Sequence, residues 1–221
     1  MAASQQMLLS QKIAAGGGGS VEIVNTGSTA PGFGSTRTMP VPAGAATGDR
    51  LIVVFIAFEA VTAFTDDEST VYTDLAIADA TADDVHYISA PLGASIPTTI
   101  SVTFAGNVFL EKADVYVVRG VSATVSDSGA FSTGFSTDPR SHAYTTSATD
   151  DLVIGIINFP GGGVTGVTGA DGDHEWVLDA ALPTGQSFGR VVASAGSYGA
   201  TLGPTGAGSV SDGYWFTLEA A

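Results

Sequence analysis

The chain has 221 residues, of which 44% are hydrophobic and 13% are charged, so it can bury a sizeable core. Seven Lys and Arg residues against 22 Asp and Glu residues give a formal net charge of −15, which disfavours binding to nucleic acid or to an anionic membrane surface. The absence of cysteine excludes disulfide bonds, thiolate metal sites and cysteine nucleophiles.

Residues 1–19 are predicted to form an N-terminal arm that ends in a glycine-rich hinge. The sizeable apolar residues of this arm are Met7, Leu8, Leu9 and Ile13. An arm of this kind is ordered only when something holds it, either a neighbouring subunit or the chain's own domain. No basic stretch precedes the short apolar run, and no segment reaches about 18 apolar residues, so we expect neither a signal peptide nor membrane insertion.

The segment Leu51–Phe58 contains eight consecutive apolar residues, most of them β-branched or aromatic, and follows a turn at Gly48-Asp49. Its length and composition favour a strand over a helix, and the lack of alternation predicts burial of both faces at the centre of a sheet. Residues 152–159 repeat the pattern, with Leu152 aligned on Leu51. The repeat indicates either two similar halves of one sandwich or a chance similarity of two core strands.

Short segments with many glycine-rich turns between them are typical of an all-β fold. We therefore predict a jelly-roll-like antiparallel β-sandwich in which residues 20–221 form a single domain. The segments at 65–70, 79–84, 122–136 and 160–166 are interpreted as loops or connections. Further strands are predicted at Val21–Val24, Thr38–Val41, Val71–Ala78, Val85–Ser89, Thr99–Phe104, Asp114–Val118, His174–Leu178, Phe188–Ala193 and Tyr214–Leu218.

Three segments carry a resemblance to a known family. They are Thr38–Gly44, the Gly48-Asp49 turn with its apolar strand, and Tyr116–Val121. Together they resemble the jelly-roll β-sandwich domains of tailed-bacteriophage and gene-transfer-agent structural proteins. The likeness covers residues 20–121 and is loose afterwards, and the family's "P-x-G-W" loop is missing, so a shared ligand site is not implied.

The resemblance implies a non-enzymatic role as a head spike, head fibre, decoration protein or tail component. Such a protein would be located in the virion, after assembly in the host cytoplasm. It would form a homo-oligomer and would also bind other structural proteins of the particle. Some proteins of this kind bind host-surface polysaccharide. The motif residues are expected to act as scaffold, with Asp49 capping a turn and Gly44, Gly48 and Gly120 allowing tight backbone geometry.

Two patterns in the C-terminal half bear on possible chemistry. Gly185–Gly189 matches the G-x-S-x-G pattern, but a nucleophile elbow requires a later histidine and none follows Ser187, so we do not expect a serine hydrolase. Asp171 and Asp173 are the candidate ligands for calcium, which needs six to eight oxygens and would find them here only with backbone carbonyls and water. We therefore expect no cofactor.

Aromatic residues in the C-terminal half suggest the alternative function, a free-standing carbohydrate-binding module or a glycan-active enzyme. Trp176, Tyr198 and Trp215 are the candidates for stacking on a sugar ring, because aromatic faces suit the apolar faces of pyranoses. The competing interpretation is that these rings belong to the core. A glycosidase would also need two carboxylates held at a set separation, which a sequence alone does not show.

Overall fold

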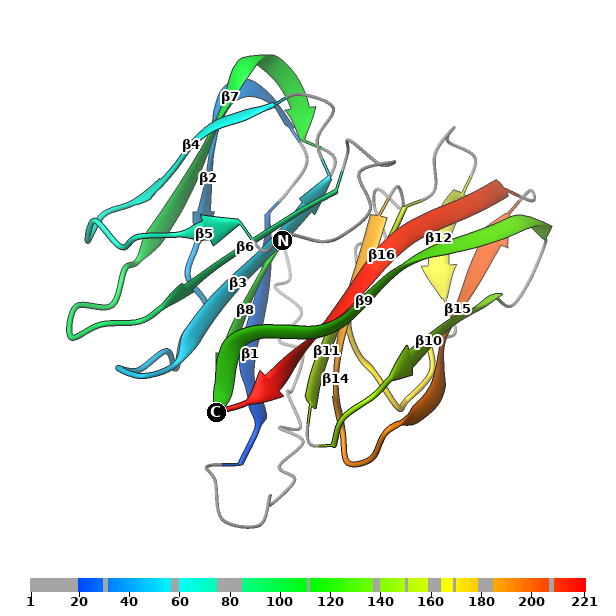
Figure 1. Cartoon of the computed structure of the whole chain (residues 1–221). Helices are drawn as coiled ribbons and strands as arrows, with labels where there is room; N and C mark the ends of the chain where they lie inside the picture. Colours follow the sequence, from blue (N-terminus) through cyan, green and yellow to red (C-terminus); the bar gives the residue numbers. More distant parts are fainter. Residues whose placement is uncertain are drawn as a thin grey trace.

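In the computed structural model of the chain, the described residues are 20–29, 32–56, 60–74, 85–110, 112–136, 140–149, 151–158, 164–168, 170–178, 185–206 and 209–221. These residues form sixteen β-strands, and no helix is present among them (Figure 1). The predicted all-β class is confirmed. The predicted arm, with Met7, Leu8, Leu9 and Ile13, lies outside the described residues, as does the acidic turn at 79–84.

The strands fall into two sets of eight. The first set is β1 (Glu22–Thr29), β2 (Gly32–Pro40), β3 (Arg50–Ile56), β4 (Val61–Asp66), β5 (Thr73–Asp74), β6 (Val85–Pro91), β7 (Thr99–Leu110) and β8 (Lys112–Arg119). The second set is β9 (Val121–Ser136), β10 (Arg140–Thr146), β11 (Asp151–Asn158), β12 (Val164–Thr168), β13 (Glu175–Val177), β14 (Gly185–Val192), β15 (Gly196–Gly206) and β16 (Ser209–Ala220).

These two sets form two units with the same topology. In the first unit the sheets have the orders β1-β8-β3-β6-β5 and β2-β7-β4, and in the second β9-β16-β11-β14-β13 and β10-β15-β12. Adding eight to each strand number of the first unit therefore reproduces the second. The strands pair antiparallel throughout. The antiparallel, sandwich-like fold is confirmed, whereas the jelly roll in particular stays a prediction.

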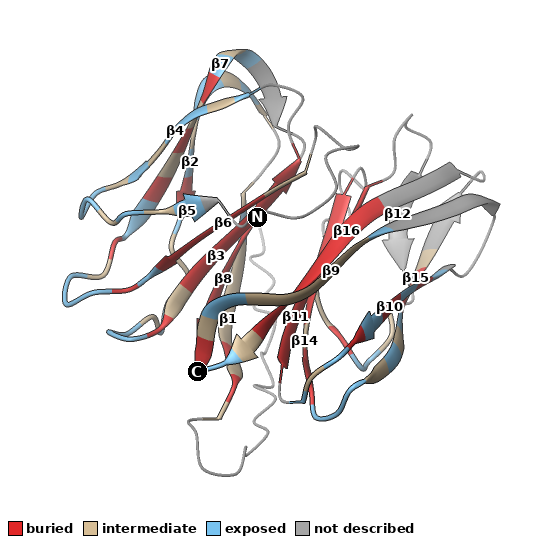
Figure 2. Cartoon of the chain, in the orientation of Figure 1, coloured by how far each residue is buried: buried red, intermediate tan, exposed pale blue. Residues whose placement is uncertain are grey.

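The four sheets stack in four layers with three apolar cores between them. One core lies between the two sheets of the first unit, a second lies between the two sheets of the second unit, and a central core joins the five-stranded sheets of both units. Figure 2 shows that the buried residues are concentrated in the central strands of this stack. We call the central core the seam. Whether residues 20–221 unfold as one domain stays a prediction.

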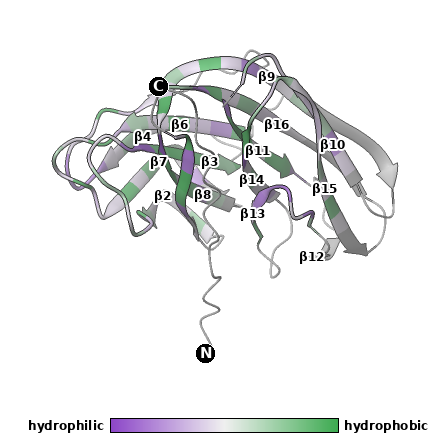
Figure 3. Ribbon diagram, turned by 90° about the horizontal axis from the view of Figure 1, so that it is seen from below, coloured by the Kyte–Doolittle hydropathy of each residue, from purple (hydrophilic) through white to green (hydrophobic). Residues whose placement is uncertain are grey.

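The two predicted core strands both occupy the middle of a five-stranded sheet. Each apolar residue of β3 is buried, and so is every residue of β11, because both faces of these strands are covered. Figure 3 shows the same strands as an apolar band through the molecule. The alignment of Leu51 on Leu152 is wrong by one residue in space, because Leu51 faces the outer core and Leu152 faces the seam. The residues of β3 that face the seam, as Leu152 does, are Ile52, Val54 and Ile56.

Several predicted connections are strands in the structure. Residues 122–136 belong to β9, and the predicted loops at 65–70 and 160–166 overlap the ends of β4 and β12. No strand was predicted over β10 or over β15. These strands are rich in Ser, Thr and Gly, and the buried positions of β10 hold His142, Tyr144 and Thr146, so the alternation between buried and exposed positions is not an alternation of apolar and polar residue types.

Close contact across the seam depends on small residues in β14. A Cβ atom at Gly185 would lie 2.5 Å from Cδ1 of Ile56, and one at Gly189 would lie 2.5 Å from Cδ1 of Ile23. Ser187 stands between these two glycines on the same face of the strand. The G-x-S-x-G pattern is therefore a strand with one small-residue face, which lets the first unit approach.

Candidate functional site

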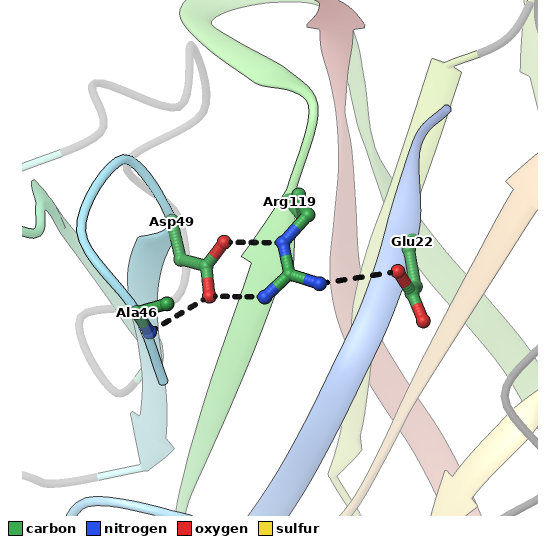
Figure 4. A network of polar contacts seen from close by, with 4 residues as sticks. All are labelled: Glu22, Ala46, Asp49 and Arg119. Atoms are coloured by element: carbon green, nitrogen blue, oxygen red, sulfur yellow. Dashed lines mark hydrogen bonds and ion pairs between the residues drawn. The ribbon is translucent and has the colours of Figure 1, made fainter. Parts of the chain in front are cut away.

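Two of the three segments that carry the family resemblance meet in one polar network at the end of β8 (Figure 4). Nε of Arg119 donates to Oδ1 of Asp49 at 2.7 Å, and Nη2 donates to Oδ2 at 2.8 Å. The same Asp49 carboxylate accepts the backbone N–H of Ala46 at 3.0 Å, and Nη1 of Arg119 reaches Glu22 at 3.5 Å. Asp49 is 2% exposed, so its charge is compensated by a bidentate guanidinium rather than by water.

The three motif glycines adopt a backbone conformation that favours glycine. The φ angles are +92° at Gly44, +90° at Gly48 and +71° at Gly120. Gly44 and Gly48 lie in the turns before β3, and Gly120 separates β8 from β9. Segments 70 residues apart in the chain thus form a single backbone scaffold, and the side chains of this network are engaged with one another.

A second polar arrangement lies inside the second unit. His174 stands between Asp171 and Tyr144, with Nδ1 2.7 Å from Oδ1 of Asp171 and Nε2 2.8 Å from the Tyr144 hydroxyl. Asp171 also accepts backbone N–H groups of Asp173, His174 and Thr201. His174 is 6% exposed and Tyr144 is 2% exposed, whereas the Asp171 side chain is 21% exposed, so this relay is buried at its Tyr144 end and reaches solvent at Asp171.

The pKa shifts of these three groups follow from burial and hydrogen bonding. Burial lowers the pKa of His174, against the opposing effect of Asp171, and burial raises the pKa of Tyr144 well above its usual value. Burial alone would raise the pKa of Asp171, but the hydrogen bonds from Thr201 and His174 outweigh it and lower the pKa. The relay therefore holds the turn 171–174 against β10 and β15.

The structure places the three candidate stacking residues around the same cluster. Trp215 is 7% exposed and packs in the core of the second unit beside Tyr144, with 5.7 Å between the ring centroids, so it offers no open face. Trp176 is half-buried, and its ring contacts those of His174 and Phe188. Tyr198 stacks on Tyr144 at 5.6 Å and is also half-buried. A saccharide-binding hypothesis is left with Trp176 and Tyr198.

An open hollow of about 330 Å³ lies at the end of the second unit. The guanidinium carbon of Arg190 stands 4.7 Å from the centroid of the Tyr198 ring. The Tyr198 hydroxyl donates to the backbone carbonyl of Ser194, which fixes the ring. The lining residues are Asp173, Arg190, Val191, Val192, Ala193, Ser194 and Tyr198.

A third group of polar side chains lies in the seam. Ser187 of β14 donates to Oδ2 of Asp114 at 2.5 Å, and the Tyr116 hydroxyl lies 2.6 Å from the same Ser187 oxygen. Tyr87 bridges the units in a similar way, since its hydroxyl donates to the backbone carbonyl of Tyr214 at 2.7 Å. Asp114 is fully buried. These bonds fix how the two units are aligned, because a shifted seam would leave buried polar groups unsatisfied.

In the described part of the chain, no three His, Cys, Asp or Glu side chains gather closely enough to hold a metal ion. The two calcium candidates have different surroundings. Asp171 is hydrogen-bonded to His174 in the turn, whereas Asp173 is exposed. Among the same residues, no helix is long and apolar enough to cross a membrane.

Sequence reasoning missed the most informative polar residues. Arg190 gave no signal, because a lone basic residue within a predicted strand has no motif. Asp114 was placed in a predicted strand and Ser187 in a rejected hydrolase motif, and their pairing across 73 positions becomes visible only in the fold. Comparisons with protein-family models, curated proteins and solved structures find no match to this chain.

Proposed function

We propose that the chain is a non-enzymatic structural protein of a phage or phage-like particle, located in the virion after assembly in the host cytoplasm. It docks through residues 1–19, forms a homo-oligomer and has other structural proteins of the particle as partners. The supporting observation is the Asp49–Arg119 network, in which two of the three motif segments of the resemblance, the Gly48-Asp49 turn and Tyr116–Val121, come together. The stack of two sandwich units suits this role, because it presents four packed sheets.

The proposed docking rests on the apolar residues of the arm. Met7, Leu8, Leu9 and Ile13 would each contribute about 1.5–3 kcal/mol if fully buried, less the entropy of ordering a glycine-hinged segment. One arm is thus a weak anchor, and several arms around a symmetric ring bind firmly through multivalency.

The experiment is light scattering after size-exclusion chromatography of the parent protein and of the double variant Leu8→Ser/Leu9→Ser. We expect an oligomeric parent, a monomeric variant and identical circular dichroism. The double variant Gln5→Ser/Gln6→Ser changes polar neighbours in the same arm and should assemble as the parent does. A monomeric parent, or an apolar-arm variant that assembles normally, contradicts the proposal.

Saccharide binding is the second candidate function, either as host-surface attachment by the particle or in a free-standing carbohydrate-binding module. One observation favours it: Tyr198, a candidate from the sequence, lines the open hollow beside Arg190. This combination of an aromatic ring, a cation and a carboxylate in one concave site is suited to a polar ligand.

A further inference from the structure

Arg190 occupies an unusual position in this acidic protein. The basic residues after position 120 are Arg140 and Arg190, so the second unit has a strong excess of carboxylates. Even so, among the ion pairs of the described residues, none joins Arg190 to a carboxylate. Its guanidinium lies instead over the Tyr198 ring in the open hollow. The Arg190 side chain also interacts with the buried Tyr144 hydroxyl. A guanidinium has five N–H donors, so those that do not face Tyr144 are left for another acceptor.

The surroundings hold Arg190 in a fixed position. Tyr198 is locked by its hydrogen bond to the Ser194 carbonyl and by stacking on the buried Tyr144. Arg190 itself lies in β14, the strand that pairs with the central strand β11. The binding group is therefore built on rigid elements, which reduces the entropy lost when a ligand binds.

The other residues that line the hollow restrict which anions it can bind. Asp173 and Ser194 are exposed side chains on the same hollow, and a carboxylate there repels a second negative charge but accepts hydrogen bonds from hydroxyl groups. Ala193, which is exposed, adds a small apolar surface. The volume of about 330 Å³ is at the small end of the range for small-molecule sites, which suits one ring rather than an extended ligand.

We propose that this hollow binds an acidic sugar residue, whose carboxylate pairs with the Arg190 guanidinium and whose ring hydroxyls donate to Asp173. A guanidinium binds a carboxylate through two parallel hydrogen bonds, so the interaction requires arginine geometry as well as positive charge. This proposal rests on saccharide binding as the second candidate function and names the class of saccharide. It does not depend on the proposed role in a particle. Loss of assembly in the arm variant leaves this binding unchanged, so the two proposals fail separately.

The test is calorimetric titration of the full chain with glucuronate, with glucose and acetate as comparison probes. We expect glucuronate to bind at least tenfold more tightly than either probe. Arg190→Gln should weaken glucuronate binding at least tenfold, and Arg190→Lys should weaken it several-fold. Arg50→Gln removes a cation of the first unit and should leave binding unchanged. Equal affinity for glucose overturns the role of the carboxylate, equal affinity for acetate overturns the role of the ring, and absence of binding at tens of millimolar overturns the whole proposal.

A second measurement shows whether the probe occupies this hollow. The positive charge of Arg190 helps to lower the pKa of His174, so an anion on Arg190 should raise that pKa. Titration of the His174 ring signals by nuclear magnetic resonance, with and without glucuronate, detects this change. Binding heat without a shift at His174 places the ligand elsewhere and overturns the assignment, and the spectra also show whether the Arg190 variants are folded.

Discussion

At the scale of single residues, buried polar groups fix the backbone and join the two units. Asp49 ties a turn to the end of β8, Asp171 ties a turn to His174, and Ser187 joins the units through Asp114. Each carboxylate accepts hydrogen bonds from donors that the fold holds in place. A buried carboxylate without such donors would ionise with difficulty, and Glu175 is the residue in which this is seen.

Glu175 lies on the same face of β13 as Val177, which belongs to the seam, and burial raises the pKa of Glu175 from 4.5 to about 7. The folded state therefore holds this proton more tightly than the unfolded state. Its contribution to stability is complete below pH 4.5 and is lost as the pH rises through 7. Between pH 5 and pH 8 we expect the free energy of unfolding of the parent to fall by about 1–2 kcal/mol relative to Glu175→Gln, with solvent screening taken into account.

Urea denaturation of the parent, Glu175→Gln and Glu68→Gln at a series of pH values measures this difference. Glu68 is exposed in a loop of the first unit, so its variant should follow the parent profile. The prediction fails if the Glu175 variant and the parent keep the same separation at pH 5 and pH 8.

At the scale of elements, the sequence predicted the buried strands better than the outer ones. Leu51–Ile56 and Leu152–Ile157 were predictable because a strand covered on both faces needs apolar residues at every position. The outer strands β10 and β15 have one wet face and fill their inner positions with His142, Tyr144 and Ala200, which give no apolar alternation. The site around Arg190 was beyond sequence reasoning for a related reason, since its parts come from a strand, a turn and a hairpin that only the fold brings together.

The central strand β3 is the element whose disruption should be most severe. Val54 is fully buried in the seam, so Val54→Asp would place a carboxylate in an apolar core. We expect the free energy of unfolding to fall by several kcal/mol, which is comparable to the whole stability of an ordinary domain. We expect the variant to be unfolded in circular dichroism and thermal melting. Val71 is 80% exposed, and Val71→Asp should change stability by less than about 0.5 kcal/mol. A folded Val54→Asp protein would contradict the central, doubly covered position of β3.

At the scale of the whole molecule, the repeated topology raises the question of whether the two units are independent. Each unit has its own core between its two sheets, which would allow separate unfolding. The seam opposes this, because its apolar residues from both five-stranded sheets would be exposed by separation, together with the Asp114–Ser187 pair. A large, apolar interface of this kind favours a single cooperative transition.

We therefore predict that both units unfold together, and the positions of the tryptophans allow a direct test. Trp176 and Trp215 both lie in the second unit, so tryptophan fluorescence follows that unit, whereas far-ultraviolet circular dichroism follows the whole chain. The two probes should give one coincident urea transition. Val102→Ala removes buried atoms from the outer core of the first unit, away from the seam, and should destabilise that unit by about 2 kcal/mol. If the units are coupled, this variant lowers the fluorescence midpoint of the distant second unit by the same amount as the dichroism midpoint. A fluorescence midpoint that stays at the parent value would show instead that the units unfold separately.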